Sequence, residues 1–496
     1  MLRALPWETR MAIVLLAALT LFRIAFAVSL DLIPDESYYW LWSKHLDASY
    51  FSKGPAVAWT IAAGTFLFGD TVLGVRWFSI LLAAGTGWQL FVLGRRLLGA
   101  RAGLIALCLA VITPLYAIGG ILMTIDPLSV FFWVWAANLF LDALDRPELW
   151  RWALCGLAIG GGFLSKYVNL LELLSFGGFL AWTPRHRHLF RSRQMGALLA
   201  AVLLSLMPVL WWNQHHGWVT AAHLQHRGDL DGGFHVRPGE LFKFIIAQAA
   251  AMSPLLWIAL LVAVWKTARR QKTEGELFLV ALFLPCFLFY ALLSVNKAAE
   301  GNWTAVSYPA AFILAAAYWP LLAAFRRSAR WFWRAAIALA IVETVLFHHT
   351  AWVHLPPKKD LLLRAQGWQD YAAQFESLRR EAQQAAGVSA PPLFLLANNY
   401  GTASELAFYL PGHPTLYLPH TEHVENQFSI WPGYAVKKGS SALYLTDDPS
   451  PVLPPVLAKE FGKAARWGNF WRKSQAGENV TRYYVWKLGP APKDVR

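Results

Sequence analysis

Charged residues are scarce in this chain of 496 residues, since Asp, Glu, Lys and Arg together make up only 15 % of it. A soluble domain carries about 25 %, whereas 56 % of this chain is hydrophobic. Long apolar runs recur along most of its length, and a helix that spans a bilayer needs about 20 such residues. The shortage of charge therefore excludes an ordinary soluble protein and predicts a polytopic α-helical membrane protein.

Acidic residues are fewer than basic ones, 30 against 44, so the net charge is +14. In a soluble protein such an excess would suggest a nucleic-acid partner. Here the basic residues gather in short gaps between alternate apolar runs, at 95–101, 185–193, 266–272 and 326–334. The positive-inside rule produces this distribution. The excess charge thus indicates orientation in a membrane, and we expect no nucleic-acid partner.

Cysteine is also rare, and Cys108, Cys155 and Cys286 all lie inside apolar segments. This excludes a disulfide framework and leaves the three as small buried hydrophobes. The chain shows no internal repeat and no low-complexity tail. Its first apolar run lacks a convincing small-residue cleavage site, so we expect a retained helix rather than a signal peptide.

The apolar runs predict about eleven spanning helices, with the amino terminus inside and the carboxyl end outside. The expected spans are 11–30, 76–94, 102–120, 127–144, 152–165, 168–183, 196–212, 241–265, 277–295, 303–322 and 335–353. The shorter apolar run 54–69 is typical of a re-entrant or interfacial helix. Residues 1–353 are therefore expected to form a transmembrane domain.

The character of the chain changes after residue 353. Residues 367–387 predict an amphipathic helix, and residues 402–410 predict another helix. The runs "PPLFLLANN", "TLYLP", "SALYLTDD" and "TRYYVWKLG" have the composition of strands. Residues 354–496 are therefore expected to form a small α/β domain at the outer surface.

The unusual polar residues fall on the predicted outer face. They are Asp35, Glu36, Lys44, Tyr50, Lys53, Asp126, Lys166, a histidine-rich loop, Lys297, Glu300 and Asn302. Ionisable groups at membrane depth are costly, so function is the default explanation for those in or near the bilayer. A site built there from several loops would face substrates carried by lipids.

Asp35 lies in "IPDESYYW", directly after the first span. Its carboxylate could accept a proton from an attacking hydroxyl, or cap a short helix through "ESYYWLWSKHL". Glu36 could orient its neighbour or interact with the dipole of that helix. Asp126 in "TIDPLS" has the form of a helix cap followed by proline, or it could be a second acid of the same site.

Lys53 in "SYFSKGP" could hold a phosphate as a point charge, or extend to the lipid headgroups. Tyr50, Trp40 and Trp42 could form an interfacial aromatic belt or a wall against a sugar or isoprenoid.

The histidine-rich loop contains His223 and His226, which are three residues apart, so one helical face could present both to a metal. No cysteine or carboxylate completes a recognised metal spacing. A divalent metal therefore stays one alternative, and no cofactor is required.

These stretches together resemble a known family. "PDESYYW", "YFSKGP", "TIDPLSVFFW" and "GNW" are similar to motifs of the GT-C glycosyltransferases that use polyprenyl-phosphate sugars. More narrowly, the chain resembles the bacterial branch related to protein O-mannosyltransferases and the lipid A aminoarabinose transferase. The likeness is strongest over residues 1–180 and looser up to residue 310, and "ASELAFYLPGHP" resembles the outer domain of many bacterial members.

The resemblance implies a GT-C fold with interfacial helices in the first outer loop. It implies that Asp35 matches the first-loop acid, a base or an orienting group for the acceptor, with Glu36 as its partner and Asp126 as the second acid. Tyr50 and Lys53 match residues near the donor phosphate in the aminoarabinose branch. The expected donor-binding set is Lys53, Tyr50, Lys166 and Asn302.

Two departures from the aminoarabinose branch bear on the site. That branch has Glu-Lys-Pro-Pro where this chain has Ser52-Lys53-Gly54-Pro55, and the missing glutamate is a metal ligand there. It also carries an arginine two places beyond the Asp-Glu pair, where this chain has Ser37-Tyr38. The missing glutamate weakens a metal role. The missing arginine suggests different contacts to the donor phosphate and a different donor sugar.

The expected activity is inverting glycosyl transfer at the outer face of a bacterial inner membrane. A polyprenyl-phosphate sugar would lie in the bilayer with its phosphate near Lys53, and the acceptor would be a lipid, glycan or protein. Asp35, with Asp126 assisting, would position or deprotonate the acceptor. The alternatives are a transporter or flippase of lipid-linked glycans, whose acids would bind ions or substrate, and a binding protein with an outer sensor domain.

Overall fold

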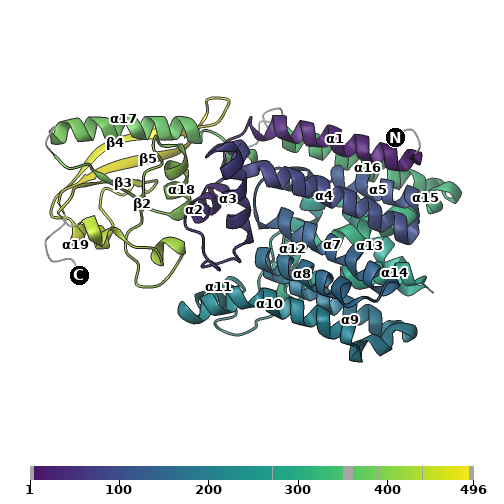
Figure 1. Ribbon diagram of the computed structural model, residues 1–496. Helices are drawn as coiled ribbons and strands as arrows, with labels where there is room; N and C mark the ends of the chain where they lie inside the picture. The colour runs from purple at the N-terminus through teal and green to yellow at the C-terminus, as the bar shows by residue number, and fades with distance from the viewer. Residues whose placement is uncertain (1–4, 271, 350–360, 388–389, 438, 491–496) are drawn as a thin grey trace.

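The computed structural model describes residues 5–270, 272–349, 361–387, 390–437 and 439–490. A bundle of helices forms most of the molecule, and a small domain with a β-sheet lies at one end of it (Figure 1). The predicted domain boundary between residues 353 and 354 lies outside the described residues.

Every span predicted from the sequence falls on one or two helices of the structure. The bundle helices are α1 (Trp7–Ala27), α4 (Val72–Leu98), α5 (Ala100–Val111), α6 (Pro114–Gly119), α7 (Ile125–Asp145), α8 (Leu149–Ser165), α9 (Glu172–Trp182), α10 (Arg193–His215), α12 (Pro238–Met252), α13 (Pro254–Arg269), α14 (Glu274–Leu293), α15 (Tyr308–Phe325) and α16 (Arg327–His348). Within the described ranges, 7 helices are long and apolar enough to cross a membrane, or up to 8 if the bent pair α12 and α13 forms one span. The predicted number of about eleven also included 102–120, 152–165 and 168–183, where the helices are shorter.

The predicted span 241–265 is broken, because α12 and α13 are bent by 104° relative to each other. Ser253 lies between them with φ of 68°, and α13 begins at Pro254. Proline lacks the N–H that would continue a helix, and it disfavours helical backbone in the residue before it. The same chemistry divides 102–120 into α5 and α6 at Pro114.

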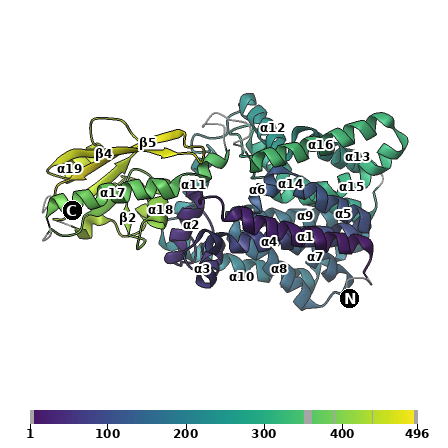
Figure 2. The same ribbon diagram turned by 90° about the horizontal axis from the view of Figure 1, so that it is seen from above.

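Two helices of the first outer loop, α2 (Pro34–Lys44) and α3 (Ala56–Phe68), lie between the bundle and the sheet domain in both views (Figures 1 and 2). This arrangement confirms short helices in the first outer loop. Side chains of the loop, among them Tyr38 and Trp42, share one hydrophobic core with Tyr371 and Leu406 of the sheet domain. The first outer loop is therefore packed on both sides.

The sheet domain has five strands in the order β2-β1-β3-β5-β4. Strand β1 (Phe394–Ala397) is parallel to β2 (Leu416–Tyr417) and β3 (Ala442–Thr446), whereas β5 (Asn479–Leu488) is antiparallel to β3 and β4 (Ala464–Lys473). Helices α17 (Trp368–Ala386), α18 (Tyr400–Tyr409) and α19 (Pro455–Glu460) complete the domain.

The predicted helices and four predicted strands of this domain are confirmed. Strand β4 was missed because its first three residues are exposed and its register shifts between Arg466 and Gly468. Both features hide the alternation that identifies a strand in a sequence.

Hydrogen bonds also fasten the sheet domain to the first outer loop. The Asp31 carboxylate accepts from the Trp368 backbone N–H at 2.7 Å, and the Leu32 N–H donates to the Tyr409 hydroxyl at 2.7 Å. Gln427 accepts from the Phe51 N–H at 2.8 Å through its side chain. The domain therefore supports the segments on either side of α2.

Candidate active site

A cavity of about 430 Å³ lies where the first outer loop, the start of α7, the end of α8, α11 (Val219–Arg227) and α14 meet. This volume is typical of a ligand pocket. Its charged and amide-bearing lining residues are Asp35, Lys53, Asp126, Lys166, Arg227, Glu300 and Asn302. The structure thus brings together five of the predicted site residues, which lie far apart in the sequence, but it leaves Glu36 and Tyr50 outside the cavity.

Asp35 is the second residue of α2, which begins at Pro34 and has Ile33 as its N-cap. The prediction that Asp35 could cap this helix is therefore wrong. Its side chain is 34 % exposed. Within the described part of the chain, the hydrogen-bond partner of its carboxylate is Arg364, which donates to Oδ2 at 3.0 Å. Oδ1 is left available, as a proton acceptor requires.

Asp126 occupies the corresponding place in α7, whose N-cap is Thr124, so the prediction that Asp126 caps this helix is also wrong. Lys166 donates to Oδ1 of Asp126 at 2.7 Å, and the Asn302 amide donates to Oδ2 at 2.6 Å. Lys166 also donates to the Asn302 carbonyl at 3.2 Å. With both oxygens engaged, Asp126 is placed to hold Lys166 and Asn302 in position.

Lys53 lines the cavity. No described residue accepts a hydrogen bond from its ammonium group or forms an ion pair with it. Burial, together with repulsion from Arg227 and Lys166, lowers the pKa of Lys53 to about 8. A cation that lacks a protein partner and faces a cavity is suited to an anionic ligand.

Gly54 allows the loop that carries Lys53 to approach the end of α8. A Cβ atom at position 54 would lie 2.1 Å from the Leu164 carbonyl oxygen, closer than any real contact. The backbone of this loop is closed by a hydrogen bond from the Tyr50 N–H to the Lys53 carbonyl at 3.1 Å. The missing side chain therefore lets Lys53 approach the cavity that Lys166 also lines.

Gly54→Ala is expected to lower kcat/KM for the predicted glycosyl transfer by about tenfold to a hundredfold, because a displacement of about 1 Å in an active site can cost that much. Gly177→Ala is the matched control, since a Cβ there meets nothing within 4 Å. Steady-state kinetics of the two variants measure the difference. Equal kinetics for both would show that the packing of Gly54 does not position Lys53.

Arg227 was not predicted as a site residue, although it lies in a loop predicted on the outer face, against the positive-inside pattern. Its guanidinium donates to Glu300 at 2.6 Å and lies over the Trp303 ring, 5.1 Å from the centroid. Together with Lys53 and Lys166 it brings three cations to the lining of the cavity. Its place in the histidine-rich loop was the signal that could have identified it.

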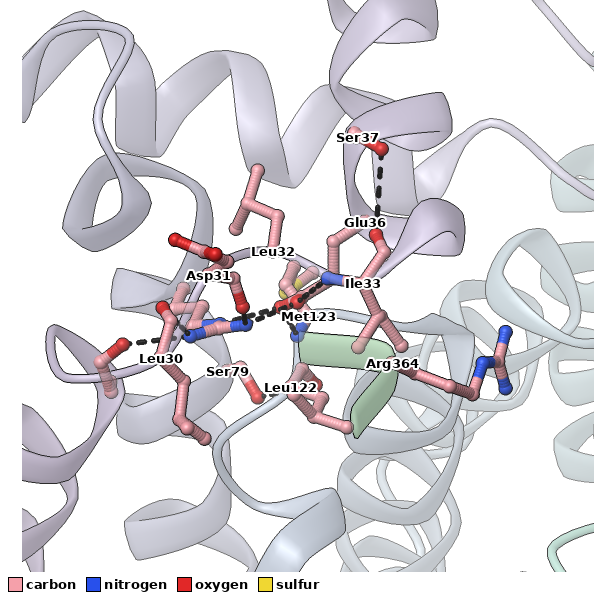
Figure 3. A network of polar contacts seen from close by, with 12 residues as sticks. Leu30, Asp31, Leu32, Ile33, Glu36, Ser37, Ser79, Leu122, Met123 and Arg364 are labelled. Carbon is pink, nitrogen blue, oxygen red and sulfur yellow. Dashed lines mark hydrogen bonds and ion pairs between the residues drawn. The ribbon is translucent and has the colours of Figure 1, made fainter. Parts of the chain in front are cut away.

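Glu36, predicted as the partner of Asp35, does not line the cavity. It is fully buried. Its Oε1 accepts from Arg76 Nε and the Met123 N–H, each at 2.8 Å, and its Oε2 accepts from a terminal nitrogen of Arg76 at 2.6 Å and the Ile33 N–H at 3.1 Å. Figure 3 shows this network, in which Glu36, Ile33 and Met123 converge. Glu36 therefore fixes α2 against the turn before α7, and with it Asp35 against Asp126.

Arg76 also donates to the carbonyl groups of Ala27, Leu30 and Asp31 at 2.7–3.0 Å. Arg76→Leu is expected to lower the free energy of unfolding by about 3–5 kcal/mol, because it leaves Glu36 buried without its partner. Lys44→Met breaks the half-exposed pair with Asp70 and should cost at most about 1 kcal/mol. Thermal unfolding in one detergent compares the two, and similar losses would contradict a central role for the buried pair.

Tyr50 was predicted to bind the donor, but it does not line the cavity. Its side chain is fully buried and stacks on Trp42 with ring centroids 4.4 Å apart. Its hydroxyl donates to the carbonyls of Trp42 or His45, each at 3.1 Å. Trp40 and Trp42 are buried in the same core, so neither a belt nor a sugar-binding wall is formed by them.

The two histidines do not assemble a metal site. His226 bonds to Asp231 at 2.6 Å on the surface, whereas His223 packs on Phe51 with ring centroids 4.7 Å apart. Burial and the nearby Lys53 lower the pKa of His223 to about 4. Among the described residues no group of three or more His, Cys, Asp and Glu could hold a metal ion. The donor set therefore does not fit a metal.

Comparison with known proteins finds similarity to glycosyltransferases along much of the chain. The family model for dolichyl-phosphate-mannose-protein mannosyltransferases matches residues 52–212. Lipid A galacturonosyltransferase RgtD of Rhizobium johnstonii is 28 % identical over 312 residues, 62 % of this chain and 65 % of that protein. The undecaprenyl phosphate-alpha-4-amino-4-deoxy-L-arabinose arabinosyl transferase of Pseudomonas aeruginosa is 29 % identical over 306 residues, 53 % of this chain. The alignments thus span 65 % and 52 % of the length of these two relatives.

The crystal structure of ArnT from Cupriavidus metallidurans in the apo state superimposes on this chain with a TM-score of 0.63 and 17 % identity. The superposition includes 96 % of this chain and 97 % of the ArnT chain. This chain has the fold of ArnT, the GT-C fold. The structure of the same ArnT bound to undecaprenyl phosphate has a TM-score of 0.60. The predicted GT-C fold is confirmed, and this GT-C protein is a multi-pass membrane protein with a C-terminal sheet domain.

Proposed function

We propose that this GT-C protein transfers a sugar from a polyprenyl-phosphate donor to an acceptor, with inversion at the anomeric carbon. The observation that carries the proposal is the cavity itself, which is lined by the carboxylate of Asp35, with Oδ1 available, and by the cations Lys53 and Arg227. The names of two relatives support an undecaprenyl-phosphate donor and lipid A as the first acceptor to test. A glycan or protein hydroxyl is the further choice.

The donor phosphate is held by the unpaired ammonium of Lys53, assisted by Arg227. Asp35 Oδ1 accepts the proton of the acceptor hydroxyl while the acceptor oxygen attacks the anomeric carbon from the face opposite the phosphate. The bond between that carbon and the phosphate oxygen breaks, and polyprenyl phosphate leaves with its charge already formed. Stabilisation of that charge by cations thus matters more than protonation of the leaving group. Asp126 keeps Lys166 and Asn302 in place beside the reacting groups.

We further propose that the protein lies in a bacterial inner membrane with its amino terminus in the cytoplasm. Residues 1–353 would form the transmembrane catalytic domain, and residues 354–496 would form the periplasmic domain. The basic clusters at 95–101, 185–193, 266–272 and 326–334 support this orientation. It would place the cavity and its lipid-linked substrates at the periplasmic face.

Transport of lipid-linked glycans is the competing function, and the named relatives favour transfer over it. Purified protein is incubated with lipid A and undecaprenyl phosphate carrying either galacturonic acid or 4-amino-4-deoxy-L-arabinose. Mass spectrometry is expected to detect lipid A that is heavier by one sugar. NMR of the product is expected to show that the anomeric configuration is inverted. Movement of the donor across proteoliposomes without modified acceptor would instead identify a flippase.

A further inference from the structure

Arg23 is a buried cation in the bundle, one turn before the end of α1 at Ala27. It is 5 % exposed. Within the described residues its guanidinium makes no hydrogen bond and no ion pair. A buried guanidinium without an anion is costly, and at membrane depth such a group marks a functional site by default. The proposed transfer reaction does not use it.

Two cavities meet at this side chain. The outer one, about 380 Å³ in volume, lies between α1 and α16, with Phe22, Ile341 and Val345 among its lining residues. The inner one is a narrow cavity of about 80 Å³ that continues among α1, α4, α5 and α7 as far as Asp126. Because Arg23 lines both, it lies between a groove at the side of the bundle and the region of the candidate active site.

The groove offers Arg23 no counter-ion among the residues that line it. Its titratable lining residues are Arg23, His348 and His349, and all three are basic. His348 donates from Nδ1 to the Thr344 carbonyl at 2.7 Å, so Nε2 is its other polar atom. The acid of the inner cavity is Asp126, and both of its oxygens are bonded to Lys166 and Asn302. The local charge is thus positive in apolar surroundings.

We propose that Arg23 binds the phosphate of a membrane lipid whose hydrocarbon chain lies in the groove between α1 and α16. A guanidinium presents paired donors that match a phosphate, and the apolar walls suit a hydrocarbon chain better than a free ion. This site is separate from the cavity of Lys53 and goes beyond the proposed transfer reaction, since lipid binding requires no sugar. The lipid phosphate comes either from a polyprenyl phosphate or from a bilayer phospholipid.

Native mass spectrometry of the delipidated full chain in an uncharged detergent tests this site. The probes are undecaprenyl phosphate and phosphatidic acid, each paired with its uncharged counterpart, undecaprenol or diacylglycerol. Arg23→Leu is expected to weaken binding of one phosphate lipid by about tenfold and to leave the uncharged lipids unaffected. Arg10→Leu, at an exposed position of the same helix, should bind like the wild type, and Arg23→Lys should fall between.

The probe that loses affinity identifies the source of the phosphate. Because Lys53 is expected to bind polyprenyl phosphate separately, the undecaprenyl phosphate arm is repeated in Lys53→Met, where the loss caused by Arg23→Leu should persist. Without lipid, the unfolding temperature of Arg23→Leu should not be lower than that of the wild type, since an unpaired buried charge has been removed. Unchanged binding of both phosphate lipids, or a lower unfolding temperature of lipid-free Arg23→Leu, would overturn the proposal. Neither result depends on whether the protein transfers a sugar.

Discussion

Asp35→Asn is expected to reduce kcat for sugar transfer by about a thousandfold, which is within the usual contribution of a general base. The amide is nearly the same size as the carboxylate, so it keeps the place of residue 35 in α2 but cannot accept the proton. Donor binding should stay within about threefold of the wild type, because Lys53 and Arg227 supply the phosphate contacts. Single-turnover kinetics with bound donor measure the chemical step directly.

The matched control is Asp231→Asn, because Asp231 is an acid of the histidine-rich loop that pairs with His226 and does not line the cavity. Its transfer rate should equal that of the wild type. If Asp35→Asn transferred sugar at an undiminished rate, Asp35 would not be the base. A loss of donor binding together with transfer would instead indicate that Asp35 orders the cavity.

Lys53→Met is expected to raise the donor KM by about tenfold to a hundredfold, because a charge-assisted hydrogen bond to a phosphate is worth about 1.5–3 kcal/mol. The rate should also fall, since the charge on the departing phosphate loses a stabilising cation. Methionine keeps the length and the apolar stem of lysine. Titration of the donor against each variant measures the affinity, and an unchanged donor KM would contradict the assignment of Lys53.

The pH dependence of donor kcat/KM should separate the effect of the charge of Lys53 from the effect of its shape. In the free enzyme the pKa of Lys53 is lowered to about 8, so the ammonium is present below this pH and is lost above it. Donor kcat/KM is therefore expected to fall as the pH rises through about 8. In Lys53→Arg the charge persists, and the fall should move to higher pH. A falling limb at the same pH in both proteins would assign it to another group.

Much of the candidate site was predictable because its residues are polar groups beside apolar spans. Asp35, Lys53, Asp126, Lys166 and Asn302 each follow or precede a span, and the alternation of loops puts them on one face. The contacts of Glu36 were not predictable, because they depend on Arg76, 40 residues away inside a predicted span. No local pattern identifies such a partner.

Shape within the helices was less predictable than their existence. Hydrophobic runs predicted where α12 and α13 lie, but the bend of 104° between them depends on Ser253 adopting a positive φ before Pro254. Tyr50 shows the same limit for side chains. An aromatic residue beside a lysine suggested a ligand contact, whereas stacking on Trp42 placed it in the core.

The proposed mechanism divides binding of the donor and acceptance of the proton between Lys53 and Asp35 within one cavity. The most direct test measures donor affinity and the single-turnover transfer rate in the same preparations of wild type, Asp35→Asn and Lys53→Met. We expect Asp35→Asn to bind the donor but to transfer its sugar far more slowly, and Lys53→Met to bind the donor weakly. Full transfer by Asp35→Asn, or undiminished donor binding by Lys53→Met, would contradict this mechanism.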